Sequence, residues 1–283
     1  MRKTLFLLYF ICIFSSCEKI KTEDSQHSSP SPPTNQVLLS SEIKWEKLNP
    51  ARGDKSPQAG TIWGDRKGRI ATGFLAKFVD GFSSPPHIHN VSYRAVVLKG
   101  LIHNDDPNAE RMWMPRASFW TQPAGEAHIT SAKGVENIAY VEIDSGPYLV
   151  KPTDQAFDNG ERPINIDINN MVWLAAGETD LIKQTNSSKH LKIAYLWQKD
   201  QMHGYLLRIS EGFEGEIMSE GEEFRAIVIE GELSYLMPQT QIEKVLDPGS
   251  YFSSRASSRH QINVNKATAT YIYIRTNDTF SIK

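Results

Sequence analysis

The chain has 283 residues, which is enough for one large domain or two ordinary domains with cores of their own. Hydrophobic residues make up 40% of it and charged residues 23%, a composition that excludes a wholly disordered chain and a small disulfide-stabilised scaffold. Its 31 basic and 33 acidic residues give a net charge of −2, so the chain has no basic excess with which to bind nucleic acid.

The N-terminus has the pattern of an export signal. Arg2 and Lys3 precede an apolar run over 5–14 that is too short to span a membrane. The end of this run, Phe14-Ser15-Ser16-Cys17, resembles the lipobox of bacterial lipoproteins, so we expect residues 1–16 to be cleaved and Cys17 to be lipidated. Ordinary secretion and an uncleaved anchor are the alternatives. A lipid on Cys17 predicts a position at the bacterial cell envelope, on the periplasmic or outer-membrane side, where only the lipid enters the membrane.

The next segment, 17–38, is polar and rich in Pro and Ser, which predicts a disordered tether. Beyond it, short runs rich in Val, Ile, Phe and Tyr alternate with Gly, Pro, Asp and Asn. Such runs are typical of β-strands separated by turns. The sequence therefore predicts an all-β fold after the tether.

An internal repeat divides this region in two. Residues 73–100 align without a gap on 204–231, at an offset of 131. A repeat of this length is too long for a solenoid unit and predicts two copies of one β-domain. We place the boundary in the Pro- and Asn-rich connection near 155–170, which gives domains over 39–160 and 161–283.

Two histidines of the first repeat have the spacing of ligands on a strand. If Pro85-Pro86-His87-Ile88-His89 opens a strand, the side chains of His87, His89 and Tyr93 share one face, because side chains alternate along a strand. The turn Pro123-Ala124-Gly125-Glu126-Ala127-His128 can bring a third imidazole to the same cavity. Three imidazoles form an open site for a divalent transition metal.

At these residues the chain resembles the cupin superfamily, whose motifs are G(X)5HXH(X)3-4E(X)6G and G(X)5PXG(X)2H(X)3N. The blocks DGFSSPPHIHNVSYR and SFWTQPAGEAHI are similar to those of bacterial bicupins of the DUF4437 type. The resemblance implies two tandem cupin barrels, each a double-stranded β-helix or jelly roll. It also implies one divalent transition metal (Zn, Mn, Fe, Ni or Cu) held by His87, His89 and His128.

Tyr93 stands where the cupin motif has Glu. A phenol with a pKa of about 10 is a poor metal ligand, so we expect Tyr93 to form hydrogen bonds beside the metal. A three-His site without a carboxylate resembles that of cupin dioxygenases that cleave diketones or oxidise thiols. Tyr93, Arg94 and Glu126 are the candidate catalytic residues, for orienting substrate or transferring protons.

The second repeat departs further from the motif. Met218 and Glu220 are expected to take the places of His87 and His89, and of the three ligands only His260 is kept. One alternative is that Glu220, Glu222 and His260 form a second metal site. The other is that the second barrel has lost its metal and serves in packing or dimerisation.

Two functions follow from this pattern. The first is an enzyme, acting on a small, anionic organic molecule by dioxygenase-like or Lewis-acid chemistry, which includes hydrolases, lyases and isomerases. The second is a non-catalytic envelope protein that binds a metal and a small ligand. The fold does not separate them, because one fold hosts many functions. A small molecule is the expected partner in either case, and a second copy of the chain is a further candidate.

Overall fold

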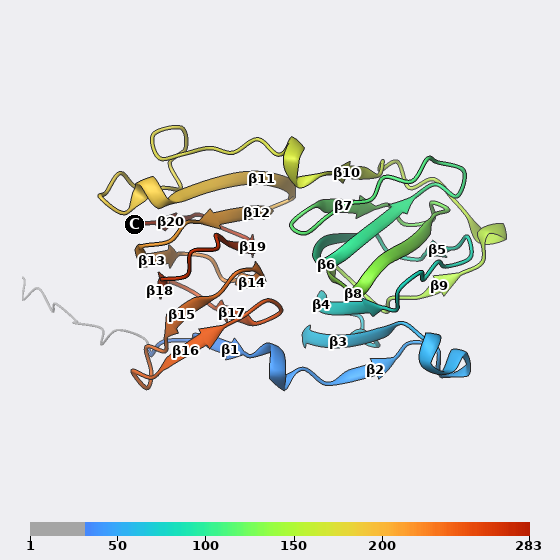
Figure 1. Cartoon of the computed structure of the whole chain (residues 1–283), viewed down its shortest axis with the longest axis horizontal. Coiled ribbons are helices and arrows are strands. Elements are labelled where there is room, and N and C mark those ends of the chain that lie inside the picture. The colour runs from blue at the N-terminus through green and yellow to red at the C-terminus, as the bar shows by residue number, and fades with distance from the viewer. Residues whose placement is uncertain (1–31) are drawn as a thin grey trace, which may run out of the picture. The chain divides into compact units, whose positions relative to one another are not determined.

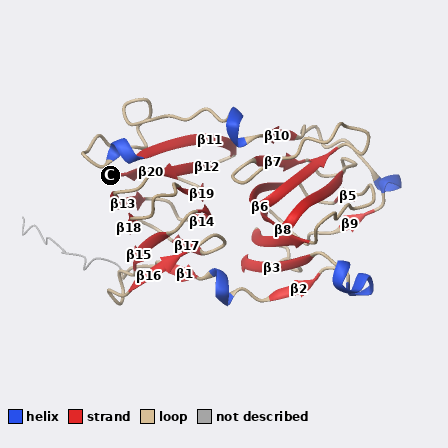
Figure 2. Ribbon diagram, in the orientation of Figure 1, coloured by secondary structure: helices blue, strands red, loops and turns tan. Residues whose placement is uncertain are grey.

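The computed structural model describes residues 32–283 (Figure 1). Strands dominate this part of the chain, and the helices in it are short 3-10 turns (Figure 2). The prediction of an all-β fold with two tandem jelly-roll barrels is confirmed. The predicted signal peptide, Cys17 and the predicted tether up to residue 31 lie outside the described residues. Over 32–283 the structure has no helix with the length and apolar character that crossing a membrane requires.

The first barrel consists of a seven-stranded sheet, in the order β10-β7-β6-β8-β4-β3-β2, and the short pair β5-β9. The long strands β6 and β8 pair from Tyr93 opposite Ile143 to Asp105 opposite Ile129, and register shifts near Lys99 bend this ladder. The strands are β2 (Trp45–Lys47), β3 (Gln58–Trp63), β4 (Thr72–Phe78), β5 (Ile88–His89), β6 (Tyr93–Asp105), β7 (Phe119–Gln122), β8 (Ile129–Ile143), β9 (Val150–Lys151) and β10 (Ile164–Ile166).

The second barrel consists of a six-stranded sheet, in the order β1-β17-β14-β19-β12-β11, and a five-stranded sheet, in the order β16-β15-β18-β13-β20. Its strands are β1 (Gln36–Leu38), β11 (Leu191–Lys199), β12 (Met202–Ile209), β13 (Phe213–Ser219), β14 (Phe224–Glu230), β15 (Leu233–Leu236), β16 (Glu243–Leu246), β17 (Tyr251–Ser254), β18 (Ser258–Val264), β19 (Thr270–Thr276) and β20 (Phe280–Ile282). The 3-10 helices of the described chain are η1 (Ser40–Glu42), η2 (Pro50–Lys55), η3 (Thr153–Gln155), η4 (Ile168–Asn170) and η5 (Ser188–His190).

The two barrels exchange edge strands. β1 precedes the first barrel in the chain, but it pairs with β17 of the second, with Val37 opposite Phe252. β10 follows the first barrel and pairs back onto β7, with Asn165 opposite Trp120. Residues 36–38, at the end of the predicted tether, are therefore part of the folded β-structure. This exchange covers one edge of each large sheet.

Apolar residues form three clusters, two of them inside the barrels and one between them. Phe213, Ile217 and Phe252 belong to the cluster inside the second barrel, and Phe74 and Trp120 belong to the cluster inside the first. The third cluster joins residues of both barrels, among them Trp63, Leu75, Leu206 and Ile227. The large sheets therefore pack against each other through buried side chains, so that the barrels share a core.

A buried ion-pair network lies at the same contact between the barrels. The carboxylate of Glu142 has no exposed surface and accepts hydrogen bonds from Tyr140 (3.1 Å) and from Tyr273 of the second barrel (2.8 Å). Arg275, also of the second barrel, lies 3.3 Å from Glu142 and 2.9 Å from Asp144. Buried charges of this kind persist only when they are paired and hydrogen-bonded. The network therefore ties the two barrels to one arrangement.

Candidate metal centre

Three histidines of the first barrel come together at one end of its cavity. The ring centroids of His87 and His128 are 4.3 Å apart, and His89 lies 5.0 Å and 5.2 Å from them. One ring nitrogen of each lies within 4.8 Å of the others. His89 and His128 are buried and His87 is half-buried. The structure therefore positions the three predicted ligands to bind a metal ion.

Main-chain carbonyls fix the tautomer of each imidazole. Nδ1 of His87 lies 2.9 Å from the carbonyl oxygen of Pro85. Nδ1 of His89 lies 3.1 Å from the carbonyl oxygen of Leu149, and Nδ1 of His128 lies 3.1 Å from that of Glu126. A carbonyl only accepts, so each Nδ1 carries the proton and each Nε2 keeps its lone pair. This is the outer hydrogen bond that metal-binding histidines ordinarily make. The donor set fits a divalent transition metal.

Burial keeps the three imidazoles neutral. Burial lowers the pKa of His87. Burial and the nearby imidazole of His87 together lower the pKa of His128 to about 3. The pKa of His89 falls well below its ordinary value, first through burial and then through His128 and His87. Neutral imidazole is the form that binds a metal. The cluster is therefore in its ligating form at neutral pH.

The strand expected to carry His87, His89 and Tyr93 is interrupted. β5 ends at His89 and β6 begins at Tyr93, and Asn90, Val91 and Ser92 form a bend between them. β5 pairs with β9 instead of continuing the ladder of β6, which is the physical reason for the difference. His87 forms an isolated bridge with His128. The rings still converge because the bend brings Tyr93 to within 5.3 Å of His89, centroid to centroid.

Three comparisons with known proteins bear on the identity of this fold. The family model described as Domain of unknown function (DUF4437) matches residues 36–283. The chain belongs to the DUF4437 family. No curated protein sequence matches it.

Solved structures similar to this DUF4437 chain are cupin-fold proteins. A Nostoc punctiforme PCC 73102 protein provisionally assigned as a dioxygenase is 15% identical, with a TM-score of 0.65 over 86% of this chain and 82% of that one. Salicylate 1,2-dioxygenase of Pseudoaminobacter salicylatoxidans is 12% identical, with a TM-score of 0.55 over 87% and 81%. Oxalate decarboxylase of Lactobacillus farciminis is 9% identical, with a TM-score of 0.55 over 91% and 89%. At these identities the likeness shows the fold alone.

In this DUF4437 chain, Tyr93 lies beside the three histidines and lines the cavity next to His87 and His89. Its hydroxyl donates to Oδ1 of Asn104 at 2.9 Å and lies 3.5 Å from Nε2 of His128. Asn104 in turn donates to Oε1 of Gln122 at 2.8 Å. Burial raises the pKa of Tyr93 above its ordinary value, so the phenol stays neutral. It is placed as a hydrogen-bonding neighbour of the proposed ligands.

Tyr148 is a further residue of the site, and nothing in the sequence indicated it. Its ring stacks on His89 with a centroid distance of 4.2 Å, and its hydroxyl lies 3.0 Å from Nε2 of His89. Nδ1 of His89 carries the proton, so Nε2 accepts from the Tyr148 hydroxyl. A metal held by Nε2 of His89 would leave that hydroxyl free to donate to a bound molecule. Tyr148 follows β8 in a loop, outside both cupin motifs, so spacing rules gave no signal for it.

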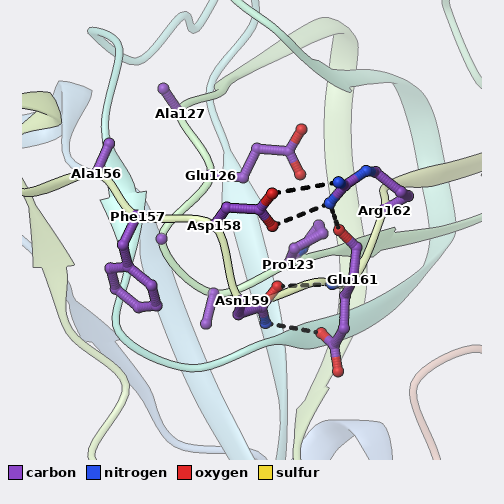
Figure 3. A pocket seen from close by; sticks show the side chains of 11 residues that line it. Pro123, Glu126, Ala127, Ala156, Phe157, Asp158, Asn159, Glu161 and Arg162 are labelled. Atoms are coloured by element: carbon purple, nitrogen blue, oxygen red, sulfur yellow. Dashed lines mark hydrogen bonds and ion pairs between the residues drawn. The ribbon is translucent and has the colours of Figure 1, made fainter.

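Glu126 lies near the ligands in the chain, but its carboxylate faces elsewhere. Figure 3 shows it in an outer pocket of about 430 Å³, beside Asp158 and Arg162. Partial burial raises the pKa of Glu126, and Arg162 opposes that shift. The histidine cavity has no lining atom from Glu126. The structure thus gives it a main-chain role, because its carbonyl holds Nδ1 of His128.

The third candidate catalytic residue, Arg94, is not brought to the histidines. It follows Tyr93 on β6, so its side chain points to the opposite face of the strand. There it forms two hydrogen bonds with Asp144, at 2.9 Å and 3.0 Å, and its guanidinium lies 3.7 Å from the ring centroid of Trp197. The structure therefore places Arg94 at the contact between the barrels and not at the histidines, and its role in orienting substrate stays a prediction.

The second barrel has no equivalent cluster among the residues that the structure describes. His260 lies opposite Ile217, as His128 lies opposite His87, so Ile217 takes the place of His87 and Ser219 that of His89. The expected places of Met218 and Glu220 are therefore wrong by one residue. The gapless alignment hides two compensating shifts. His87 is five positions after Phe82, but Ile217 is four positions after Phe213; Tyr93 is then six positions after His87, but Phe224 is seven positions after Ile217.

The alternative of a second site on Glu220, Glu222 and His260 is also corrected. Both glutamates are exposed, whereas His260 is fully buried. Nδ1 of His260 lies 2.7 Å from the Tyr235 hydroxyl, and its Nε2 lies 3.0 Å from Oγ of Ser254. Both ring nitrogens are used in the core, so His260 is a hydrogen-bonded core residue.

The connection between the barrels holds the turn that carries His128. Oγ of Ser92 donates to Glu161 and accepts from the main-chain nitrogen of Ala124 at 3.0 Å. Phe157 donates to the carbonyl of Gly125 at 3.0 Å, and a Cβ added to Gly125 would lie 2.4 Å from the Phe157 carbonyl oxygen. This close approach requires glycine at that position. The segment 157–161 therefore positions the ligand-bearing turn from outside.

We expect Glu161→Gln to lower metal affinity by up to about tenfold, the lower edge of the effect of losing a direct partner of a metal ligand, because Glu161 acts on His128 only through Ser92 and the turn. The neutral amide has one acceptor oxygen, so it cannot accept both from Ser92 and from the ammonium of Lys199, which lies 3.1 Å from Glu161. Asp158→Asn is the matched control, because Asp158 pairs with exposed Arg162 in the same segment. Titration with zinc compares the two variants, and equal affinities would show that the Glu161 contact does not reach the turn.

Proposed function

We propose that the first barrel binds one divalent transition metal through His87, His89 and His128 and acts on a small, anionic organic molecule beside it. The observation that carries this proposal is the common orientation of the three imidazoles, each with Nδ1 held by a carbonyl and Nε2 free of the main chain. A divalent metal bound there supplies a Lewis acid with open coordination positions and, where it is redox-active, a centre for oxygenase chemistry.

The surrounding residues support binding of an anion. The three ligands are neutral, so nothing in the ligand set compensates the charge of a divalent ion. Tyr93 and Tyr148 are both neutral phenols, because burial raises the pKa of each. A metal on Nε2 of His89 would leave the Tyr148 hydroxyl free to donate to an oxygen of the substrate, and the Tyr93 hydroxyl would serve in the same way by turning from Asn104. The solved structures that share the fold include a dioxygenase, a decarboxylase and a hazelnut vicilin, so the fold is compatible with an enzyme without requiring one.

A non-catalytic binding protein is the second candidate, and one observation favours it. The cavity beside the histidines is lined by no carboxylate, since Glu126 faces the outer pocket. A reaction that needs a carboxylate as general base therefore has none in place. Turnover by the metal-loaded protein would decide for the enzyme.

We expect Tyr93→Phe to keep metal affinity within about tenfold, because Tyr93 contacts a ligand without replacing one. Loss of its hydrogen bond to a charged ligand should weaken carboxylate binding or slow turnover by about 1 to 3 kcal/mol. Calorimetric titration with zinc and then with a carboxylate measures both effects. Complete loss of the metal would instead identify Tyr93 as a ligand, and the preference for anions would then lose its basis.

We also propose that the chain is anchored at the cell envelope by a lipid on Cys17. Support comes from the lipobox-like Phe14-Ser15-Ser16-Cys17, which lies outside the described residues, and from the polar segment after it. The wild-type chain should partition into a detergent phase, and Cys17→Ser should stay in the aqueous phase or remain unprocessed. Identical partitioning of the two would contradict the proposal.

A further inference from the structure

A cavity of about 460 Å³ opens beside His87 and His89, within the size range of small-molecule sites. Aromatic side chains line much of it, and apolar side chains continue to its mouth, where Leu48 and Val150 are 45% and 65% exposed. The aromatic residues are Phe74, Phe78, Phe82, Tyr93, Trp120 and Tyr148. Such walls gain free energy by covering an apolar surface and gain little from a small, fully polar ion.

The charge of the lining is one-sided. No Asp or Glu contributes to it, and its cationic side chain is Arg52, of the segment η2. The guanidinium lies 5.6 Å from the ring centroid of Phe82, and Arg52 forms no ion pair with any described residue. A cation at the mouth and a metal at the histidines would both attract a negatively charged group.

One buried donor in the cavity wall lies against Tyr93. The side chain of Trp120 is 2% exposed, and its Nε1 has no acceptor in close hydrogen-bond geometry among the residues described. Its N–H lies beside the Tyr93 hydroxyl, which donates in turn to Asn104. Trp120 therefore helps to hold Tyr93 in place at the cavity wall.

From these features we infer that the bound molecule is a monocarboxylate with an apolar, ring-sized body, an inference that rests on the proposed function. The carboxylate belongs at the metal, and the body belongs among Phe74, Phe78 and Phe82. This differs from a compact dianion such as malonate, which would leave the aromatic walls uncovered.

The test is a ligand series on the zinc-loaded full chain, measured by calorimetric titration. Benzoate and cyclohexanecarboxylate should bind at least about tenfold more tightly than acetate and malonate, because only they bury a ring. Phe78→Ser should remove most of this preference while leaving the affinities for zinc and acetate unchanged. Val172→Ser, at a side chain that is 76% exposed, is the matched control and should change nothing.

The outcomes separate the two claims. Failure of the wild-type chain to bind zinc overturns the proposed function, and this inference with it. Zinc binding with acetate or malonate as tight as benzoate, or with no carboxylate binding at all, overturns only the inference. The wild-type series decides the point even where Phe78→Ser does not fold.

Discussion

Replacing His89 with alanine should lower metal affinity by more than about 100-fold, the upper end of the effect of losing an outer partner of a ligand. His89 is 3% exposed and lies between the other two imidazoles and Tyr148. Without it only His87 and His128 remain, and two imidazoles do not compete with water for a divalent ion as three do. We expect one zinc ion per wild-type chain and none per His89→Ala chain, measured by metal analysis of the folded protein.

Two histidine controls make this test specific. His203→Ala removes a half-buried imidazole of the second barrel that stacks on Tyr205, and metal binding should be unchanged. His260→Ala should also keep the metal but lower the free energy of unfolding, because the Tyr235 hydroxyl and Ser254 lose a partner in the core. Two zinc ions per wild-type chain, or loss of zinc in His260→Ala, would contradict the interpretation of the second barrel.

Much of the site was predictable because short spacings limit where a side chain can lie. Two residues separated by one position on a strand face the same way, and the turn before His128 needs glycine for close contact with Phe157. The repeat was visible for a similar reason. A Cβ at Gly73 would lie 2.1 Å from Nε1 of Trp63, and one at Gly204 would lie 1.8 Å from Nε1 of Trp197, so glycine is required in both barrels.

The remaining features depend on contacts between distant segments. Tyr148 reaches His89 from a loop 59 residues away, and Glu161 reaches Ser92 from the connection 69 residues away. Two compensating one-residue shifts leave both ends of the alignment matched. Sequence similarity alone therefore assigned Met218 to the place of His87, whereas the strand pairing assigns Ile217. Arg94 is next to Tyr93 in the motif, but side chains alternate along a strand, so Arg94 lies on the face opposite to Tyr93.

The contact between the barrels gives the second large effect: Arg275→Met should lower the free energy of unfolding by about 3 to 5 kcal/mol. Removing the guanidinium leaves the Glu142 carboxylate, which has no exposed surface, with the hydroxyls of Tyr140 and Tyr273 and with Arg94 at 3.8 Å. A buried charge without adequate pairing is one of the few changes that lower the free energy of unfolding by this much. Urea denaturation followed by circular dichroism measures the change.

The double variant Glu142→Gln/Arg275→Met separates the unpaired charge from lost packing. If the charge on Glu142 is the main cause, the double variant should recover at least half of the loss, because a neutral amide is far less costly to bury. Arg162→Met, which breaks the exposed pair with Asp158, is the matched control and should change stability by less than about 1 kcal/mol. The guanidinium of Arg275 lies 5.7 Å from the ring centroids of both Trp63 and Trp197. If the double variant is as unstable as Arg275→Met alone, the lost stability comes from this packing and not from the charge of Glu142. Recovery would show instead that the pairing of Arg275 with Glu142 keeps the barrels in the arrangement that the shared core requires.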